Sequence, residues 1–235
     1  MTDIYAVVGN PVEHSQSPFI HQSFAAQTSQ DLDYERWLVP IDGLKPWIDA
    51  QLHASTPNKS FKGCNITIPF KFDAFALATE LTPRAKLAGA INTLHFTHGE
   101  CLGDNTDGVG LVRDLQHNAG LPLKGQSILI LGAGGASAGV LGPLLETQPS
   151  ELVIANRTQE KAQTILNQHQ HLSDRLSVKV QSSTLEALNR PFDVVINATA
   201  ASLQQAQLPI SPIIFGPNCL AYDMMYGPKI GRAHV

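Results

Sequence analysis

The sequence predicts an α/β protein of two domains, and three observations support that fold class. Apolar stretches of strand length alternate with amphipathic stretches of helix length along most of the chain. Four apolar residues in a row, at 128–131, fit a strand buried on both faces, as in a parallel sheet, and a glycine-rich turn follows them directly. The chain has 235 residues, 43% of them apolar, which is enough to supply a core for each of two domains.

The first half is expected to contain four strands and two long helices. The strands are predicted at 4–8, 34–39, 61–68 and 90–96, the helices at 19–27 and 44–53, and further helical turns between 72 and 87. Alternation in the third strand places Asn65 and Thr67 on one face. The opposite, apolar face then holds Cys64, Ile66 and Ile68. Polar side chains at the carboxyl end of a parallel strand indicate ligand binding.

Three polar residues of the first half stand out by their position. Ser17 precedes Pro18, so it is expected to cap the first helix. Ser15 lies in the loop before it, where a ligand contact and a simple turn are both open interpretations. Lys71 follows Pro69 and falls in the first turn of a helix, where the helix dipole disfavours a cation. Its presence there therefore needs another reason.

The second half repeats the alternation of strand and helix, which predicts a right-handed, doubly wound parallel sheet. The strands are expected at 128–131, 152–155, 177–180, 193–199 and 219–224, and the helices at 160–168 and 185–188. A further helix, from 110 to about 118, crosses from the first half without a flexible linker. We therefore expect a domain boundary near Gly108 and a hinge role for the crossing helix.

The glycine-rich turn has the form of a dinucleotide cradle. Gly132 and Gly134 lack Cβ atoms, so the chain can turn sharply and its amides can approach an anion. The small residues that follow open a helix, whose free N–H groups favour phosphate. The residues assigned to this cradle are Gly132, Ala133, Gly134, Gly135 and Ala136. A small-residue turn that only packs a helix against a sheet would give the same pattern.

Three residues after the 152–155 strand, Asn156, Arg157 and Thr158, decide which dinucleotide is favoured. In this kind of unit, a residue about 20 positions beyond the glycines lies beside the adenosine ribose, where an acid accepts the 2′-hydroxyl of NAD. The sequence has no acid there. Arg157 offers a planar fork to a 2′-phosphate, and Thr158 and Lys161 add donors, which favours NADP. In the alternative interpretation, Asn156 and Thr158 cap the next helix and Arg157 is solvated.

Composition argues against several other kinds of protein. The net charge of −4 and the isoelectric point near 6.1 provide no basic field for nucleic acid. Three cysteines without zinc or redox spacing indicate reduced thiols in the cytoplasm. Nine histidines are scattered without a metal-binding pattern, so no metal site is expected. No stretch has the character of a signal peptide or a membrane span.

Eight segments along the chain match one known family in the right order. They lie at 9–11 with 15–18, 63–71, 89–93, 103–108, 132–136, 156–158, 197–199 and 222–226, and they span nearly all of the chain. Over these segments the chain resembles the shikimate dehydrogenase family. The resemblance implies reversible, NADPH-dependent reduction of 3-dehydroshikimate to shikimate in aromatic amino acid biosynthesis. It also implies a substrate-binding catalytic domain at 1–107 and an NADP-binding Rossmann domain at 108–235.

The resemblance also assigns roles to single residues. Lys71 and Asp107 match the family's catalytic pair. The chemistry agrees, since an ammonium group can stabilise the charge that develops on a carbonyl during hydride transfer and deliver a proton. Asp107 would orient that amine and hold a substrate hydroxyl. The residues that match substrate contacts are Ser15, Ser17, Asn65, Thr67, Asn92 and Tyr226, and those near the nicotinamide are Thr199 and Met224. The alternatives are a surface salt bridge for the pair and packing at a strand end for Met224 and Tyr226.

The chain departs from the family pattern in two places. Ala200 and Ser202 stand where the family has serine and glycine, so the loop near the cofactor is expected to sit differently. The family continues past the tyrosine motif into terminal helices, one with a substrate-binding glutamine, whereas this sequence stops after 229–235. Because 230–235 match the translation of a common sequencing adapter, we expect an artificial end that lacks these helices. Such a loss predicts low stability and weak activity.

Two other functions are kept beside the NADP-dependent shikimate dehydrogenase. Within the enzyme class, the alternative is a quinate/shikimate dehydrogenase that uses NAD, which Arg157 and Thr158 disfavour. From a different class, the alternative is a dinucleotide-binding regulatory module without catalysis, and the missing terminus is the argument for it. The expected partner is a small-molecule substrate, with no nucleic acid or membrane partner, for a monomer or a homodimer.

Overall fold

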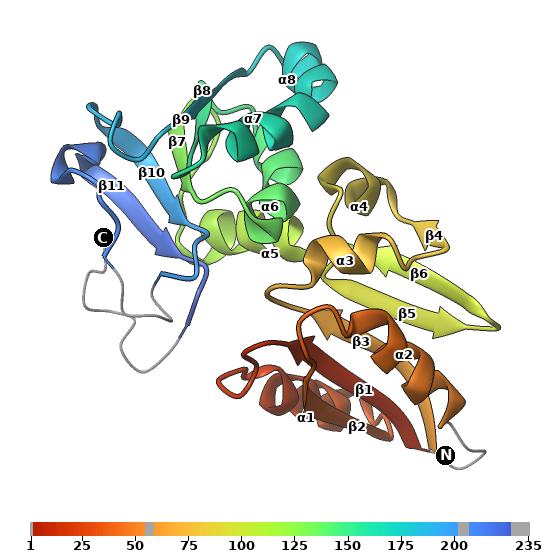
Figure 1. Cartoon of the computed structure of the whole chain (residues 1–235). Helices are drawn as coiled ribbons and strands as arrows, with labels where there is room; N and C mark the ends of the chain where they lie inside the picture. The colour runs from red at the N-terminus through yellow and green to blue at the C-terminus, as the bar shows by residue number, and fades with distance from the viewer. Residues whose placement is uncertain (1, 55–58, 202–206, 227–235) are drawn as a thin grey trace. The chain divides into compact units, whose positions relative to one another are not determined.

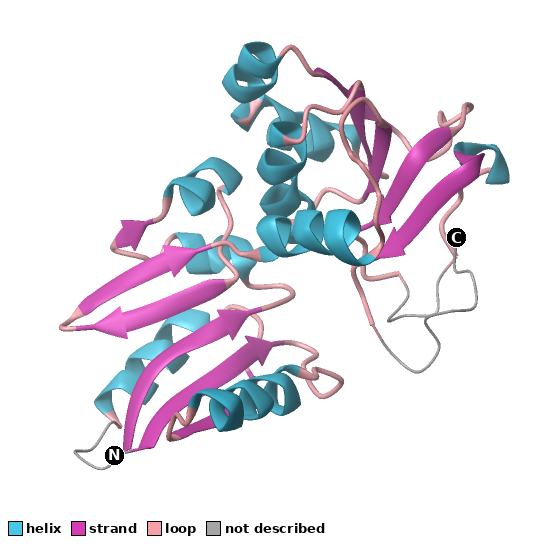
Figure 2. Cartoon of the chain, turned by 180° about the vertical axis from the view of Figure 1, so that it is seen from behind, coloured by secondary structure: helices cyan, strands magenta, loops and turns pink. Residues whose placement is uncertain are grey.

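The computed structural model describes residues 2–54, 59–201 and 207–226. The chain divides into two compact units, Met1–Thr106 (unit 1) and Asp107–Val235 (unit 2), and each unit has a sheet of its own (Figures 1 and 2). Among the described residues, we find no helix with the length and apolar character needed to cross a bilayer.

Unit 1 is built on a six-stranded mixed sheet with the strand order β2-β1-β3-β5-β6-β4. Its strands are β1 (Thr2–Gly9), β2 (Leu32–Leu38), β3 (Lys59–Ile66), β4 (Glu80–Leu81), β5 (Thr93–Thr97) and β6 (Glu100–Asp104). β1 is parallel to both β2 and β3, whereas β5 runs antiparallel to β3 and β6. The carboxyl ends of β1, β2 and β3 therefore share one edge of the sheet, where α/β proteins bind ligands.

Helices cover both faces of the unit 1 sheet. They are α1 (Ser17–Thr28), α2 (Leu44–His53), α3 (Lys71–Phe75) and α4 (Pro83–Ala88). On one face, Ile48 of α2 joins Val8 and Ile66 in a buried cluster. On the other face, the His21 ring of α1 stacks on the Tyr34 ring of β2, with 4.2 Å between their centroids. The predicted alternation is confirmed in β3, because its buried side chains belong to one face and Asn65 to the other.

Unit 2 contains a five-stranded parallel sheet with the strand order β11-β10-β7-β8-β9. Its strands are β7 (Ser127–Leu131), β8 (Glu151–Ala155), β9 (Lys179–Ser183), β10 (Phe192–Asn197) and β11 (Phe215–Asp223). The helical segments are α5 (Asp107–Arg113), the π-helix η1 (Asp114–Asn118), α6 (Gly135–Glu146), α7 (Gln159–Gln168), α8 (Gln170–Leu176) and the 3₁₀ turn η3 (Pro212–Ile214). The four residues 128–131 are fully buried, and β7 lies between strands that lead outward in both directions. The predicted doubly wound sheet is confirmed.

Several predicted elements differ from the structure. The helix expected at 185–188 is wrong: the segment forms turns, with Leu185 and Leu188 buried against the unit 2 sheet. The strand expected at 61–68 ends at Ile66, two residues earlier than expected. The sequence did not predict α8, whose segment is largely polar. The crossing helix begins at Asp107, three residues earlier than expected, and ends as the π-helix.

The predicted cap of the first helix is also wrong. Gln16 occupies the N-cap position of α1, and Ser17 is the first helical residue. The Ser15 hydroxyl instead accepts a hydrogen bond from the Ser17 N–H, at 3.3 Å. Two expectations concern positions outside the described residues: Ser202, and the end of the chain from 227 to 235.

Candidate active site

The chain segments that follow β1 and β3 are joined at the carboxyl edge of the unit 1 sheet. The Thr67 N–H donates to the Val8 carbonyl at 2.9 Å, and the Asn10 N–H donates to the Ile68 carbonyl at 2.8 Å. Gly9 allows this close approach, since a Cβ atom there would lie 2.4 Å from Cγ2 of Thr67. The two loops therefore lie together, and the predicted residue Thr67 is in one of them.

Asn65 is held by a set of hydrogen bonds at the end of β3. The Tyr34 hydroxyl donates to Oδ1 of Asn65 at 2.5 Å. Nδ2 of Asn65 donates to Oγ1 of Thr93 at 3.1 Å and to the Asn92 carbonyl at 3.3 Å. The side chain of this predicted substrate contact is thus fixed by groups from β2 and β5.

Asn92 connects the segment before β5 to the segment after β6. Nδ2 of Asn92 donates to Oγ1 of Thr106 at 2.9 Å, and its Oδ1 accepts from the Thr106 N–H at 3.0 Å. One residue before, the Ile91 N–H donates to the Lys71 carbonyl at 2.9 Å. The backbone of Lys71, the side chain of Asn92 and the residue before Asp107 therefore belong to one hydrogen-bonded network.

Lys71 is placed by the first turn of α3, as the sequence predicted. Phe70, the residue before it, is 1% exposed and Ala74 is fully buried, so the short helix is anchored in the core. The Lys71 side chain itself is half-buried. Its ammonium group can therefore reach solvent or a ligand while its backbone stays fixed.

Asp104 anchors the loop that leads to Asp107. Its carboxylate accepts from the Thr82 hydroxyl at 2.6 Å, from Nε of Arg84 at 2.7 Å and from the Asn105 N–H at 2.7 Å. A second guanidinium nitrogen of Arg84 makes the pair bidentate. The hydrogen bonds from Arg84, with help from Thr82 and Asn105, lower the pKa of Asp104 to about 2. The carboxylate is therefore ionised over the whole range in which such a protein works.

The two predicted serines lie next to each other at the start of α1. The Ser15 hydroxyl donates to Oγ of Ser17 at 3.1 Å, and Ser15 is only 4% exposed. Nε of Arg36, from β2, donates to the Ser15 carbonyl at 2.6 Å. The pair presents two neutral hydroxyls in a loop fixed by the neighbouring strand, which suits a small oxyanion or a hydroxyl ligand.

The glycine turn of unit 2 has the backbone geometry of an anion cradle. Gly132 has a φ of +104°, and a Cβ atom there would lie 3.0 Å from Cγ2 of Thr199. A Cβ atom on Gly134 would meet nothing within 4 Å, and no side chain caps the α6 N-terminus there. The space at Gly134 and the uncapped N–H groups of a twelve-residue helix fit a pyrophosphate. Ala133, Gly135 and Ala136 complete the turn and open the helix.

The residues predicted to contact the 2′-phosphate follow β8. Arg157, Thr158 and Lys161 are exposed, and Nδ2 of Asn156 donates to the Thr158 carbonyl at 2.8 Å. Thr158 occupies the N-cap position of α7, but its side chain makes no cap hydrogen bond. The capping interpretation is therefore wrong for the Thr158 side chain. Arg157 and Thr158 lie in the turn that follows β8. Because β8 pairs with β7, this turn is next to the glycine turn that follows β7.

Thr199 and Met224 are linked through two residues that the sequence analysis did not single out. Oδ1 of Asn197 accepts from the Thr199 hydroxyl at 2.7 Å, and Nδ2 of Asn197 donates to Asp223 at 3.1 Å. The Asp223 carboxylate also accepts from the Met225 N–H at 2.8 Å, while the Met224 N–H donates to the Asn197 carbonyl at 3.0 Å. The ends of β10 and β11 are thus joined, and half-buried Met224 is part of that junction.

Comparisons with known proteins show the family to which the chain belongs. A model of the shikimate dehydrogenase substrate-binding domain matches residues 7–94, and a model described as shikimate / quinate 5-dehydrogenase matches residues 114–207. The shikimate dehydrogenase (NADP(+)) of Methylibium petroleiphilum is 50% identical over 227 residues, which cover 96% of this chain and 77% of that protein. The protein of the same name from Janthinobacterium sp. is 52% identical over 226 residues, with 96% and 79% covered. The chain belongs to the shikimate dehydrogenase family.

Solved structures of shikimate dehydrogenases have the same fold. The enzyme from Thermus thermophilus, crystallised in complex with NADP(H) and shikimate, has a TM-score of 0.78 and 30% identity. That match covers 97% of this chain and 80% of the other. An Ael1 enzyme from Pseudomonas putida has a TM-score of 0.81 and 41% identity, with 96% and 80% covered. The predicted family and its two-part α/β fold are confirmed.

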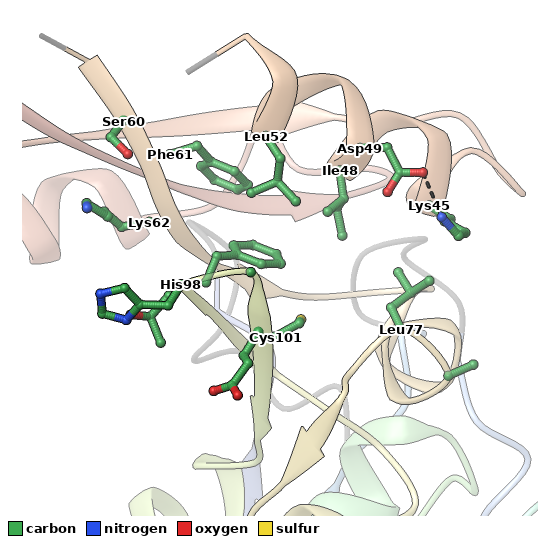
Figure 3. A pocket seen from close by; sticks show the side chains of 15 residues that line it. Lys45, Ile48, Asp49, Leu52, Ser60, Phe61, Lys62, Leu77, His98 and Cys101 are labelled. Carbon is green, nitrogen blue, oxygen red and sulfur yellow. Dashed lines mark hydrogen bonds and ion pairs between the residues drawn. The ribbon is translucent and has the colours of Figure 1, made fainter. Parts of the chain in front are cut away.

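The pocket that Figure 3 shows belongs to unit 1 and is not lined by the residues predicted for the shikimate dehydrogenase site. It measures about 580 Å³ and is lined from α2, the beginning of β3 and the β5–β6 hairpin (Figure 3). Ile48, Phe61 and Leu77 give it apolar walls. The described residues that line it include none of the predicted site residues, and it takes Ser60, Phe61 and Lys62 from the end of β3 opposite Asn65.

Possible metal ligands and thiols were located among the described side chains. Within the described part of the chain, no group of three His, Cys, Asp or Glu side chains could hold a metal ion. The three cysteines are free thiols, and burial raises the pKa of the Cys101 thiol to about 11. A thiol with a raised pKa is a poor nucleophile near neutral pH.

Proposed function

We propose that this chain oxidises shikimate with NADP⁺ and reduces 3-dehydroshikimate with NADPH, using Lys71 and Asp107 as its catalytic pair. The main support is the network that joins the Lys71 backbone, Asn92 and Thr106 at the carboxyl edge of the unit 1 sheet. Those hydrogen bonds hold the backbone of Lys71 and the residue before Asp107. Two relatives that carry the name shikimate dehydrogenase (NADP(+)) are 50% and 52% identical to this chain in sequence.

Lys71 is proposed to handle the proton of the reaction. The nicotinamide, when bound, accepts or supplies the hydride. In the reducing direction, negative charge develops on the carbonyl oxygen, and the Lys71 ammonium stabilises that charge and donates a proton to the oxygen. In the oxidising direction, the amine takes the proton of the hydroxyl. Asp107 is proposed to orient the amine and to hold a neighbouring substrate hydroxyl.

The substrate is proposed to bind through neutral groups. Ser15 and Ser17 would hold the carboxylate without an arginine, with the Ser15 proton turning from Oγ of Ser17 to the ligand. Asn65, Thr67 and Asn92 would hold the ring hydroxyls, with Tyr226 beside them. Asn65 and Asn92 are already fixed by their protein partners, so little side-chain entropy is lost when they bind a ligand.

The cofactor is proposed to bind on unit 2. The pyrophosphate would lie on the turn formed by Gly132, Ala133, Gly134, Gly135 and Ala136, at the N-terminus of α6. Asn156, Arg157, Thr158 and Lys161 would hold the adenosine ribose and its 2′-phosphate, and Thr199 and Met224 would lie near the nicotinamide. The domain roles follow: residues 1–107 bind substrate and residues 108–235 bind NADP. Three free thiols and a net charge of −4 support work on a small molecule in the cytoplasm.

The direct test is the appearance of reduced-nicotinamide absorbance when the chain is mixed with NADP⁺ and shikimate. The Lys71→Ala variant is expected to lower kcat by roughly 100-fold or more, while NADP⁺ still binds. Lys62→Ala is the matched control, because this lysine lies in β3 and lines the pocket at the other end of that strand. Full activity of Lys71→Ala would remove Lys71 from the mechanism.

The same assay separates the family's two substrate classes. One family model that matches this chain is described by both shikimate and quinate, so both alcohols should be tested with both NADP⁺ and NAD⁺. The proposal expects the highest kcat/KM for shikimate with NADP⁺. A higher value for quinate with NAD⁺ would favour the alternative enzyme instead.

A further inference from the structure

The Tyr34 hydroxyl lies in an unusual place for a residue of an outer strand. Tyr34 belongs to β2, at the edge of the unit 1 sheet, yet its hydroxyl reaches past β1 to Oδ1 of Asn65 in β3, at 2.5 Å. Its ring is 5% exposed and packs with Val7 and Val12. His21 of α1 stacks on it, with planes 4° apart. The hydroxyl is therefore aimed by a buried ring that cannot swing away.

These contacts determine what Asn65 can offer to a ligand. Both N–H groups of its amide have protein acceptors, the Thr93 hydroxyl and the Asn92 carbonyl. Oδ1 accepts from Tyr34, but an amide oxygen has a second lone pair. A ligand can therefore form one further hydrogen bond to the Asn65 side chain, in which the ligand donates and Oδ1 accepts.

β2 also holds the loop that contains Ser15. Arg36 lies two residues after Tyr34 on the same face of β2, and its Nε donates to the Ser15 carbonyl at 2.6 Å. One strand thus holds two groups that the proposed function assigns to substrate. Neither Tyr34 nor Arg36 needs to touch the substrate to have this effect.

We propose that Tyr34 is a positioning residue, which fixes Asn65 as the hydrogen-bond acceptor for a hydroxyl group of the substrate. The inference rests on the proposed function, because it takes Asn65 as a substrate contact. Without the phenolic hydroxyl, Oδ1 of Asn65 loses its protein donor and the amide is less firmly oriented. Substrate binding then weakens, while the cofactor, which is held by unit 2, is unaffected.

The test uses Tyr34→Phe in the full chain, since this change removes one oxygen and keeps the buried ring. We expect the KM for shikimate to rise roughly tenfold, and kcat and the KM for NADP⁺ to change by less than about twofold. Tyr222→Phe is the matched control, because the Tyr222 hydroxyl donates to Asp114 at 2.9 Å within unit 2. It removes a comparable hydrogen bond and should leave the KM for shikimate unchanged.

A double-mutant cycle distinguishes positioning from a general loss of structure. If Tyr34 acts through Asn65, the double variant Tyr34→Phe/Asn65→Ala should have a KM for shikimate less than about twofold above that of Asn65→Ala alone. An unchanged KM in Tyr34→Phe, or a full additional rise in the double variant, would overturn the inference while the wild type still turned over shikimate. A wild type that bound NADP⁺ but neither bound nor oxidised shikimate would overturn the proposed function, and this inference with it.

Discussion

Single residues of the two units differ in how much the fold constrains them. Asn65 and Asn92 make hydrogen bonds to neighbouring strands and loops, and Asn92 is only 8% exposed. Arg157 and Lys161 are exposed side chains on a turn and a helix. Fixed neutral amides favour recognition of one arrangement of hydroxyl groups, whereas exposed cations attract a phosphate over a wider range of geometries.

The Asp104–Arg84 pair predicts how stability depends on acid. The folded-state pKa of Asp104, about 2, lies below its ordinary value of 3.8, so the pair stabilises the fold above about pH 4 and this stabilisation is lost as the pH falls towards 2. Because Arg84 is 40% exposed, we expect a contribution of about 1–2 kcal/mol. The measurement is the free energy of unfolding of wild type, Asp104→Asn and Arg84→Met at several pH values. Equal acid dependence in all three would contradict the prediction.

Arg157 predicts the choice between the two nicotinamide dinucleotides. Arg157→Ala removes the guanidinium proposed to hold the 2′-phosphate, so the KM for NADP⁺ should rise roughly tenfold or more. The KM for NAD⁺, which lacks that phosphate, should change by less than about twofold. Arg175→Ala, at the end of α8 in the same unit, is the control for loss of one positive charge. A parallel rise for both cofactors would show that Arg157 does not read the phosphate.

At the scale of secondary structure elements, the turn between β7 and α6 allows a test with two glycines. Gly132 needs its positive φ of +104°, so Gly132→Ala should lower the free energy of unfolding by about 1–3 kcal/mol and weaken NADP⁺ binding. Gly134→Ala meets no atom within 4 Å and should leave stability unchanged or raise it by about 0.5 kcal/mol. Thermal unfolding and NADP⁺ titration of both variants are the measurements. Equal destabilisation by both would contradict this account of the turn.

The sequence predicted elements best where the pattern was long or marked by special residues. The helix expected at 44–53 coincides with α2, and the 128–131 strand lies within β7. The predicted helix at 185–188 is absent. Leu185 and Leu188 have helical spacing, but they lie in a turn whose side chains are buried against the sheet. A spacing of three residues suits one turn as well as a helix, and only the packing of the sheet decides between them.

The candidate site was predicted as separate motifs, but not the side chains that connect them. Tyr34, Arg84 and Asp223 make their key hydrogen bonds to residues 20 to 31 positions away in the sequence. No local rule of capping, turns or periodicity links such distant positions. Tyr34 in particular fits a buried strand residue, and only the register of β2, β1 and β3 brings its hydroxyl to Asn65.

At the scale of the whole molecule, the two units have separate cores and separate proposed ligands. One buried cluster contains Val8, Ile66 and Leu94 of unit 1, and another contains Leu129, Val195 and Ile214 of unit 2. The division at Thr106 and Asp107 falls directly after the residue that Asn92 holds. The ligands proposed for the two units can therefore be tested one at a time.

Hydrogen exchange with one ligand at a time tests this division of roles. A ligand that binds only the folded state slows the exchange of the amides whose opening it opposes. NADP⁺ alone should therefore slow exchange in unit 2, most of all at 132–138, where the glycine turn leads into α6. Shikimate alone should slow hydrogen exchange in unit 1, at 15–17 and 65–71.

NAD⁺ at the same concentration is the control for the 2′-phosphate and should protect the glycine turn of unit 2 less than NADP⁺ does. If NADP⁺ protected only unit 1, or shikimate only unit 2, the assignment of substrate to residues 1–107 and cofactor to 108–235 would be wrong, even if the chain still catalysed the reaction.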